Sequence, residues 1–294
     1  MTDVGGALSA FPCLAVDIGA SKIEAAVVAR NGSIQARERV DVASYPHELF
    51  DALVDLLKRV RADHVIDVIG VGCAGPMTRG GVTVSPLNIA QWRLFPLQQK
   101  LRDALNTEVY VDGDARALAL AEGAFGAARD IDSYLSMVVS TGVGGAFVLN
   151  GRLLDGATGN AGHVGHLNVV TNGALCSCGA RGCLEAEASG WAIESRTGRS
   201  ASDADQATRL RTGELVGRAV GTLSSVLDFR SCFVAGSVAL GFGDEFFVEA
   251  NKAARTVAMM PYSHDVEIRK SQLGNDGPLL GAALVGWRGA SCED

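Results

Sequence analysis

The sequence predicts an α/β fold of two lobes, and two observations indicate it. Apolar runs typical of strands alternate with helical patterns along most of the 294 residues. One arrangement also occurs twice, at 13–29 and at 133–149: an apolar strand, a polar glycine-rich turn and a returning strand. Such an internal repeat indicates two similar lobes, whose turns would close on one anion.

The elements of the first lobe follow from short apolar runs bounded by turn residues. Asn31-Gly32 is a hairpin signal between two such runs. A helix is expected behind Pro46, because leucine and valine recur there at helical spacing and proline suits a first turn. The expected strands cover 13–17, 23–29, 33–42, 65–73, 82–84 and 109–114, the expected helices cover 46–62, 95–105 and 115–128, and residues 1–11 are expected to form a loose tail.

The second lobe continues the alternation of strands and helices. Strands are expected at 133–140, 146–149, 231–235 and 265–271, and helices at 184–196, 214–229, 244–258 and 278–287, with a polar stretch at 201–211. We place the first lobe at residues 1–117 and the second at 118–275. We also expect the C-terminal helix, over 276–294, to pack back on the first lobe.

The composition excludes several classes of protein. With 48% apolar and 20% charged residues, the chain is typical of a well-folded soluble protein. A net charge of −7 argues against general nucleic-acid binding, which needs a basic face. No apolar run approaches the roughly 18 residues of a membrane span, and no apolar leader segment precedes the first strand. We therefore expect a cytoplasmic protein without nucleic-acid or membrane partners.

Three of the seven cysteines lie within eight residues, on a loop punctuated by glycine. Cys176, Cys178 and Cys183 supply three thiolates, and His166, ten residues upstream, can complete a tetrahedral zinc site. Four protein ligands leave no open position, so the site would be structural and not hydrolytic. The alternative is three unconnected thiols. A disulfide is not expected, because the cysteine count is odd and the chain is long enough to build a core.

Two glycine turns follow strands in a way that suits phosphate binding. In the turn at 17–22, backbone N–H groups and the hydroxyl of Ser21 can hold a phosphate, while Asp17 can orient a metal-bound water. Asp-x-Gly turns also occur in many unrelated hairpins, which is the alternative. The turn at 141–145 has the same form. Asp114 ends a strand beside a helix start, so it can face a ligand or serve as an ordinary N-cap.

Together these residues resemble the ROK family of sugar kinases, which has the two-lobed actin-like ATPase (ribonuclease H-like) fold. The resemblance covers residues 12–288. It is most specific at Gly165-His166 followed by Cys176-x-Cys178-Gly-x-x-Gly-Cys183-Leu-Glu185, the zinc signature of the family. The turns at 17–22 and 141–145 correspond to its two phosphate loops, and Gly236-Ser237 resembles its adenosine-side turn.

The resemblance implies transfer of a phosphoryl group from Mg·ATP to a sugar hydroxyl, with Asp114 as general base and a structural zinc loop in the second lobe. It assigns zinc to His166, Cys176, Cys178 and Cys183; ATP to Asp17, Gly19, Ser21, Lys22, Thr141, Gly142, Gly144, Gly236 and Ser237; and the sugar to Asn88, Asp114, His163, His166 and Glu185. Family members are often dimers, so a homodimer is expected by analogy alone.

Four residues depart from the family pattern. Gly113 and Arg116 replace the asparagines of the family motif Asn-Asp-Ala-Asn, and His163 replaces a glutamate that contacts sugar hydroxyls. Ala20 replaces a glycine of the first phosphate loop. We expect the reaction class to survive, with weaker glucose binding in a less stringent pocket. Arg116 could reach an acidic or amide group of another substrate, and His163 could instead only fill space beside the zinc loop.

An ATP-dependent hexose kinase, of the glucokinase or N-acetylhexosamine kinase type, is the leading hypothesis. The runner-up is a sugar-sensing protein that keeps the fold and zinc but has lost turnover, which the changes at Gly113 and His163 favour. A weaker alternative is a kinase that uses polyphosphate, for which the chain offers no basic run. A transcriptional repressor is not expected, because only twelve residues precede the first strand.

Overall fold

The computed structural model of the protein describes residues 11–87 and 89–291. The chain divides into two compact units. The first contains the described parts of 1–121, 155–160 and 275–294, and the second contains 122–154 and 161–274. The chain therefore enters the second unit twice and returns to the first unit twice. The expected tail lies, up to residue 10, outside the described residues, as does Asn88.

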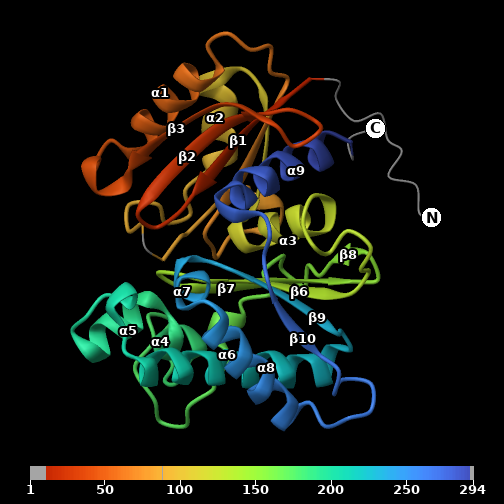
Figure 1. Ribbon diagram of the computed structural model, residues 1–294. Coiled ribbons are helices and arrows are strands. Elements are labelled where there is room, and N and C mark those ends of the chain that lie inside the picture. Colours follow the sequence, from red (N-terminus) through yellow and green to blue (C-terminus); the bar gives the residue numbers. More distant parts are fainter. Residues whose placement is uncertain (1–10, 88, 292–294) are drawn as a thin grey trace. The chain divides into compact units, whose positions relative to one another are not determined.

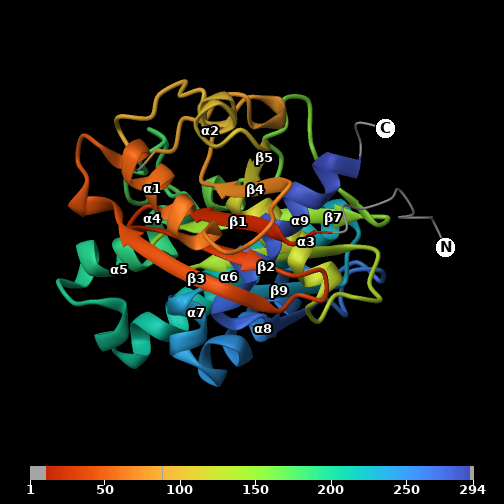
Figure 2. The same cartoon turned by 90° about the horizontal axis from the view of Figure 1, so that it is seen from above.

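The first unit is built on a sheet of five strands: β1 (Cys13–Ile18), β2 (Lys22–Val28), β3 (Ile34–Asp41), β4 (Val68–Cys73) and β5 (Glu108–Gly113). Figure 2 shows them in the order β3-β2-β1-β4-β5. β2 is antiparallel to both β1 and β3, whereas β4 is parallel to β1 and β5 is parallel to β4. Because β1, β4 and β5 are parallel, their carboxyl ends lie on one edge of the sheet, where ligands of α/β proteins usually bind.

Helices cover both faces of this sheet (Figure 1): α1 (Leu49–Arg61) and α2 (Leu97–Leu105) on one face, α9 (Gly277–Ser291) on the other. The leucines of α1 and α2 pack against alternate apolar strand residues, such as Ile69 and Val71. Between those two residues, Gly70 faces α9, and a Cβ placed there would lie 1.9 Å from the carbonyl oxygen of Ala282. Glycine is therefore required where α9 crosses β4.

The expected strand at 82–84 is wrong. Arg79–Gly81 forms a short 3-10 helix, η2, and Val84 makes only isolated bridges to Met77 and Phe95. Gly80 and Gly81 both have positive φ values, a conformation that turns the chain and prevents a continuous strand.

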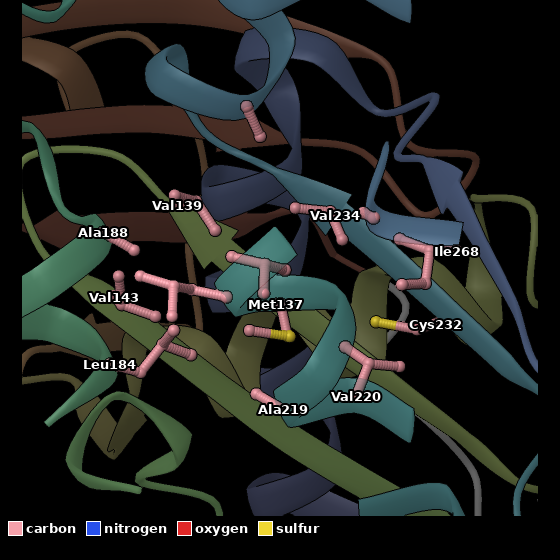
Figure 3. Close-up of a cluster of buried hydrophobic side chains, with 14 of the residues drawn as sticks. Met137, Val139, Val143, Leu184, Ala188, Ala219, Val220, Cys232, Val234 and Ile268 are labelled. Carbon is pink, nitrogen blue, oxygen red and sulfur yellow. The ribbon is translucent and has the colours of Figure 1, made fainter. Parts of the chain in front are cut away.

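The second unit is built on another sheet of five strands: β6 (Tyr134–Val139), β7 (Val143–Leu149), β8 (Arg152–Leu153), β9 (Ser231–Ala235) and β10 (Glu267–Lys270). Their order is β10-β9-β6-β7-β8, with β6 antiparallel to β7 and parallel to β9. Figure 3 shows Met137 and Val139 of β6 in one buried cluster with Val234 of β9 and Ile268 of β10. Side chains at alternate strand positions thus build the core of this unit.

Two long helices of the second unit, α6 (Gln206–Leu227) and α8 (Asp244–Val257), pack against each other. α6 carries glycine at every fourth position, Gly213, Gly217 and Gly221, which places all three on one face. A Cβ at Gly217 would lie 2.1 Å from the carbonyl oxygen of Ala250 in α8. The glycine stripe therefore permits a close approach of the two helix backbones.

The helices of the second unit differ from the expected pattern at two boundaries. The expected helix at 184–196 is two helices, α4 (Leu184–Ala188) and α5 (Gly190–Thr197), because Ser189 is extended and caps α5 by accepting a hydrogen bond from Ala192 N. α6 begins eight residues earlier than expected, since Asp205 caps it through Thr208 N.

Among the described helices, including the short α7 (Ser237–Phe242) and α3 (Asp114–Ala124), none is long and apolar enough to cross a membrane.

Candidate active site and metal centre

Two carboxylates of the first unit meet at the carboxyl edge of its sheet. Asp17 lies near the end of β1, and Asp114 is the first residue of α3, directly after β5. Gly72 of β4 lies beside both, because a Cβ placed there would be 3.6 Å from Cα of Asp114 and 3.9 Å from Oδ1 of Asp17. The parallel register of three strands thus brings together two acids that are far apart in the sequence.

The environment of this pair favours a nearby cation. Burial, and after it the charge of Asp114, raises the pKa of Asp17 from 3.8 to about 7, against a smaller opposite effect of Lys22. A half-buried carboxylate such as Asp17, beside a second acid, becomes easier to ionise when a metal ion lies close to it. Oδ1 of Asp114 also accepts a hydrogen bond from Ala115 N at 2.7 Å, so this side chain serves the helix start as well.

The first phosphate turn, residues 17–22, is a tight connection between β1 and β2. Gly19 N donates to the carbonyl oxygen of Lys22 at 3.0 Å. The ammonium of Lys22 donates to the buried Glu24 at 2.8 Å, so it lies on the sheet and would reach a phosphate only by leaving this ion pair. Exposed Ser21 and the backbone N–H groups of the turn are the stronger candidates for phosphate contacts.

Two glycine turns of the second unit lie next to each other. The turn at 140–143 follows β6, and Gly236-Ser237 follows β9, which is parallel to β6. The hydroxyl oxygens of Ser140 and Ser237 are 3.0 Å apart, and a Cβ at Gly236 would lie 2.4 Å from the carbonyl oxygen of Val139. Ser140 was not among the site residues predicted from the sequence, although a hydroxyl side chain at the end of a strand is a signal of a binding site. Backbone N–H groups and hydroxyls therefore gather at one edge of the second sheet.

β7 begins at Val143, three residues earlier than expected. Gly144 consequently lies inside the strand, whereas Thr141 and Gly142 form the turn. The turn is closed by a hydrogen bond from Ser140 N to the carbonyl oxygen of Gly142, at 2.9 Å. The turn expected to bind phosphate is therefore shorter than the sequence pattern indicates.

Four side chains converge in the loop before α4. The donor atoms of His166, Cys176, Cys178 and Cys183 all lie within 4.8 Å of one another. Sγ of Cys178 and Sγ of Cys183 are 3.7 Å apart, and Nδ1 of His166 is 3.6 Å from Sγ of Cys176. A tetrahedral zinc ion with bonds of about 2.3 Å to sulfur and about 2.0 Å to nitrogen requires separations of about 3.8 Å and about 3.5 Å. The donor set fits zinc, with Nδ1 as the imidazole ligand.

Hydrogen bonds and an ion pair also hold this loop. Cys176 N donates to the carbonyl oxygen of Ala180 at 2.8 Å. The buried carboxylate of Glu187 accepts a hydrogen bond from Ala174 N at 2.7 Å and pairs with Arg211 of α6 at 2.5 Å. Glu187 and Arg211 were missed from the sequence, because the pattern does not show which charged residues turn inward. They attach the metal loop to α6.

The residues expected to contact the sugar are distributed over both units. In the second unit, Oε2 of Glu185 accepts a hydrogen bond from Val143 N at 3.0 Å. His163 is exposed, and its ring stacks beside that of His166, with centroids 6.0 Å apart and planes at 23°. His163 does not belong to the group of four metal donors. Asp114 lies in the first unit, and Asn88 is outside the described residues.

Arg116 is engaged by two carboxylates of its own unit. Its guanidinium lies 2.6 Å from Oδ1 of Asp112 and 2.6 Å from Oδ1 of Asp155. A Cβ added at Gly113 would lie 3.3 Å from Cδ of Arg116, so the arginine side chain occupies the space beside this glycine. The two departures from the Asn-Asp-Ala-Asn motif are therefore structurally coupled.

Known proteins are similar to this chain over nearly their whole length. A model of the ROK family matches residues 13–287. N-acetylmannosamine kinase of Haemophilus influenzae is 32% identical over 290 residues, which are 92% of this chain and 94% of that protein. The enzyme of the same name from Yersinia pseudotuberculosis is 33% identical over 296 residues, 95% and 98% of the two chains.

Solved structures give the same picture. A ROK family glucokinase from Streptomyces griseus, in complex with glucose and AMPPNP, has a TM-score of 0.84 at 27% identity, covering 94% of this chain and 99% of that chain. The ROK hexokinase from Thermus thermophilus has a TM-score of 0.80 at 30% identity, covering 96% and 99%. Both similarities extend over the two units described above.

Proposed function

Because the chain belongs to the ROK family of sugar kinases, we propose that it transfers the terminal phosphoryl group of Mg·ATP to a hydroxyl of a hexose or N-acetylhexosamine. The observation that carries this proposal is the pair of Asp17 and Asp114 at one sheet edge, with the pKa of Asp17 raised to about 7. The named relatives provide the first sugars to test, N-acetylmannosamine and glucose.

Asp114 is the proposed general base. Its carboxylate lies at a strand end, where it can accept the proton of a sugar hydroxyl as the new bond to phosphorus forms. A base positioned in this way contributes roughly 10²–10⁴-fold to the rate. Asp17 would orient a water of the magnesium ion, which neutralises negative charge on the phosphate oxygens. In each unit, backbone N–H groups of one turn, at 17–22 and at 140–143, are proposed to bind phosphate oxygens.

The cluster of His166, Cys176, Cys178 and Cys183 would bind zinc as a structural ion. Four protein ligands leave no position for water or substrate, so the ion would take no part in the chemistry. Its proposed contribution is to fix two elements beside it. These are the 3-10 helix η3 (Val164–His166) and α4, which carries Glu185, a proposed ligand of the sugar.

The choice of sugar would depend on Gly113 and His163. An asparagine at position 113 would offer a hydrogen bond to a hydroxyl, whereas glycine offers none. Arg116 does not replace that contact in our proposal, because its guanidinium is engaged by Asp112 and Asp155. The exposed His163 would offer one neutral acceptor or donor in place of a carboxylate. We therefore propose that glucose binds weakly.

A screen of sugars for ATP consumption tests the proposed function. The zinc-replete protein is incubated with Mg·ATP and N-acetylmannosamine, glucose, N-acetylglucosamine or mannose, and ADP release is measured, with Asp114→Asn as the inactive control. The proposal is supported if the wild type phosphorylates at least one of these sugars and Asp114→Asn does not. Sugar binding without turnover would instead identify a sensor, and turnover with polyphosphate but not ATP would change the donor. A homodimer and a cytoplasmic location remain predictions.

A further inference from the structure

Glu185 contacts the second phosphate turn directly. It lies on α4, two residues after the metal-cluster residue Cys183. Oε2 of Glu185 accepts the hydrogen bond of Val143 N at 3.0 Å. A Cβ at Gly142 would lie 2.7 Å from the same oxygen, so the carboxylate is packed against the turn. One oxygen of Glu185 therefore holds the residue at which the turn ends.

The segment after Glu185 holds the same turn at two further points. Gly190 N donates to the carbonyl oxygen of Ser140 at 2.7 Å, and Trp191 N donates to that of Thr141 at 3.2 Å. These bonds satisfy carbonyl groups of the turn. Because Ser140 N and Val143 N already donate to Gly142 and Glu185, the N–H groups of Thr141 and Gly142 are the ones proposed to contact phosphate. The start of α5 and the carboxylate of Glu185 thus fix both sides of the turn at 140–143.

Side-chain packing makes α4 a firm support for this contact. Figure 3 shows Leu184 and Ala188 of α4 together with Val143 of β7 in the buried core of the second unit. Leu184 N also donates to the carbonyl oxygen of Leu167, next to His166, at 2.8 Å. Core packing therefore fixes the backbone position of Glu185. A displacement of its carboxylate would alter the hydrogen bond that Val143 N donates to it.

The second oxygen of this carboxylate can accept a ligand. Within the part of the chain that the structure describes, the hydrogen bond from Val143 N to Oε2 is the one that the Glu185 side chain makes. The side chain is half-buried, and an ionised carboxylate can accept hydrogen bonds at both oxygens. Oε1 can thus bind a sugar hydroxyl while Oε2 keeps its bond to the turn.

We propose that Glu185 couples sugar binding to nucleotide binding by positioning the turn at 140–143. A sugar hydroxyl on Oε1 would fix the carboxylate, and Oε2 would then hold Val143 N and the turn in the conformation that binds phosphate. The sugar contact rests on the proposed function, whereas the positioning of the turn does not. Because such coupling is reciprocal, sugar should tighten nucleotide binding by the same factor as nucleotide tightens sugar binding.

The first test measures nucleotide binding without any sugar. The dissociation constant of Mg·AMPPNP is determined by calorimetry for wild type, Glu185→Ala and Glu194→Ala, together with zinc content. Glu194 is a matched control, an exposed carboxylate on α5. We expect Glu185→Ala to bind the nucleotide roughly five- to tenfold more weakly than the wild type. Its Val143 amide hydrogen should also exchange faster with solvent. Glu194→Ala should behave as the wild type in both measurements. Nucleotide binding within twofold of wild type, with unchanged Val143 exchange, would overturn the proposal.

The second test changes a residue of the turn, Gly142, and leaves Glu185 unchanged. Alanine at position 142 places a Cβ 2.7 Å from Oε2 and must displace the carboxylate, whereas Gly241→Ala meets no neighbour and is the control. Gly142→Ala should weaken sugar binding severalfold in the absence of nucleotide. It should also reduce the factor by which saturating sugar tightens Mg·AMPPNP binding in the wild type. The coupling would be overturned if Gly142→Ala bound sugar as tightly as the wild type. It would also be overturned if saturating sugar did not tighten Mg·AMPPNP binding in the wild type.

The two proposals can fail separately. If no sugar is phosphorylated, the proposed function fails, but the sugar-free titration and the exchange of Val143 still decide whether Glu185 positions the turn. If a sugar is phosphorylated and Glu185→Ala weakens only the binding of that sugar, Glu185 is a sugar ligand without influence on the nucleotide. In that case the coupling alone is refuted.

Discussion

Replacing Asp17 with asparagine should stabilise the protein at pH 8 and change its stability little near pH 4, when magnesium is absent. Burial and the charge of Asp114 raise the pKa of Asp17 from 3.8 to about 7. The folded state therefore binds this proton more tightly than the unfolded state does. The resulting stabilisation is fully present below about pH 4 and is lost as the pH rises to about 7.

The magnitude follows from the pKa values. Raising a pKa from 3.8 to about 7 corresponds to at most about 4 kcal/mol of unfolding free energy, since each pKa unit is worth about 1.4 kcal/mol. Above pH 7 the wild type carries this cost in full, because Asp17 is ionised in both states. Asparagine has no charge to bury, so the variant avoids the cost.

Urea unfolding of wild type, Asp17→Asn and Asp51→Asn at pH 4.5 and pH 8, in magnesium-free buffer, measures the effect. Asp51 is a matched control, because it is an exposed aspartate on α1 of the same unit. The difference in unfolding free energy between Asp17→Asn and wild type should be larger at pH 8. An equal difference at both pH values would refute the reasoning. With Mg·ATP and sugar, the same variant should require more magnesium for activity, and wild-type magnesium dependence would contradict the metal-side role of Asp17.

Three further predictions concern the base, the metal and the sugar. Asp114→Asn should lower kcat by roughly 10²–10⁴-fold while sugar and ATP still bind in calorimetry, and retention of a tenth of kcat would exclude Asp114 as base. Purified protein should contain about one zinc per chain by metal analysis, and Cys178→Ser should lower this content; protein never exposed to chelator but free of zinc would contradict the site. Gly113→Asn combined with His163→Glu should raise glucose affinity by about tenfold or more, measured as KM, provided that Arg116 moves to admit the new Cβ. Unchanged affinity for every sugar would show that neither position contacts the ligand.

Local patterns predicted the parts of the fold that depend on neighbours in sequence. The hairpin at Asn31-Gly32 and the loop that brings Cys176, Cys178 and Cys183 together each lie within a short segment, so spacing alone predicts that their residues meet. The alternation of strands and helices likewise indicated two sheets with helices, which the structure and the ROK family match confirm.

Long-range contacts could not be predicted in this way. The sequence indicated only that Arg116 could reach a substrate group, and nothing local shows that Asp155, 39 residues away, pairs with its guanidinium. Nothing local shows that Glu185 accepts a hydrogen bond from Val143. The helix break at Ser189 was also not predicted, although serine is a common N-cap and Gly190 is a poor helix former, because the preceding residues Leu184–Ala188 are good helix formers. Such features depend on which segments the fold brings together.

The packing of α9 against β4 determines which of the two units can complete its core first during synthesis. Residues of α9, among them Leu279 and Trp287, are buried, and Gly286 lies against Gly70. α9 leaves the ribosome after β1, β4 and β5, so the face of these strands that it covers lacks its apolar partner until α9 has been synthesised. The strands of the second unit, in contrast, all lie between residues 134 and 270. The second unit can therefore acquire its core before α9 has been synthesised, whereas the first sheet can complete its packing only afterwards.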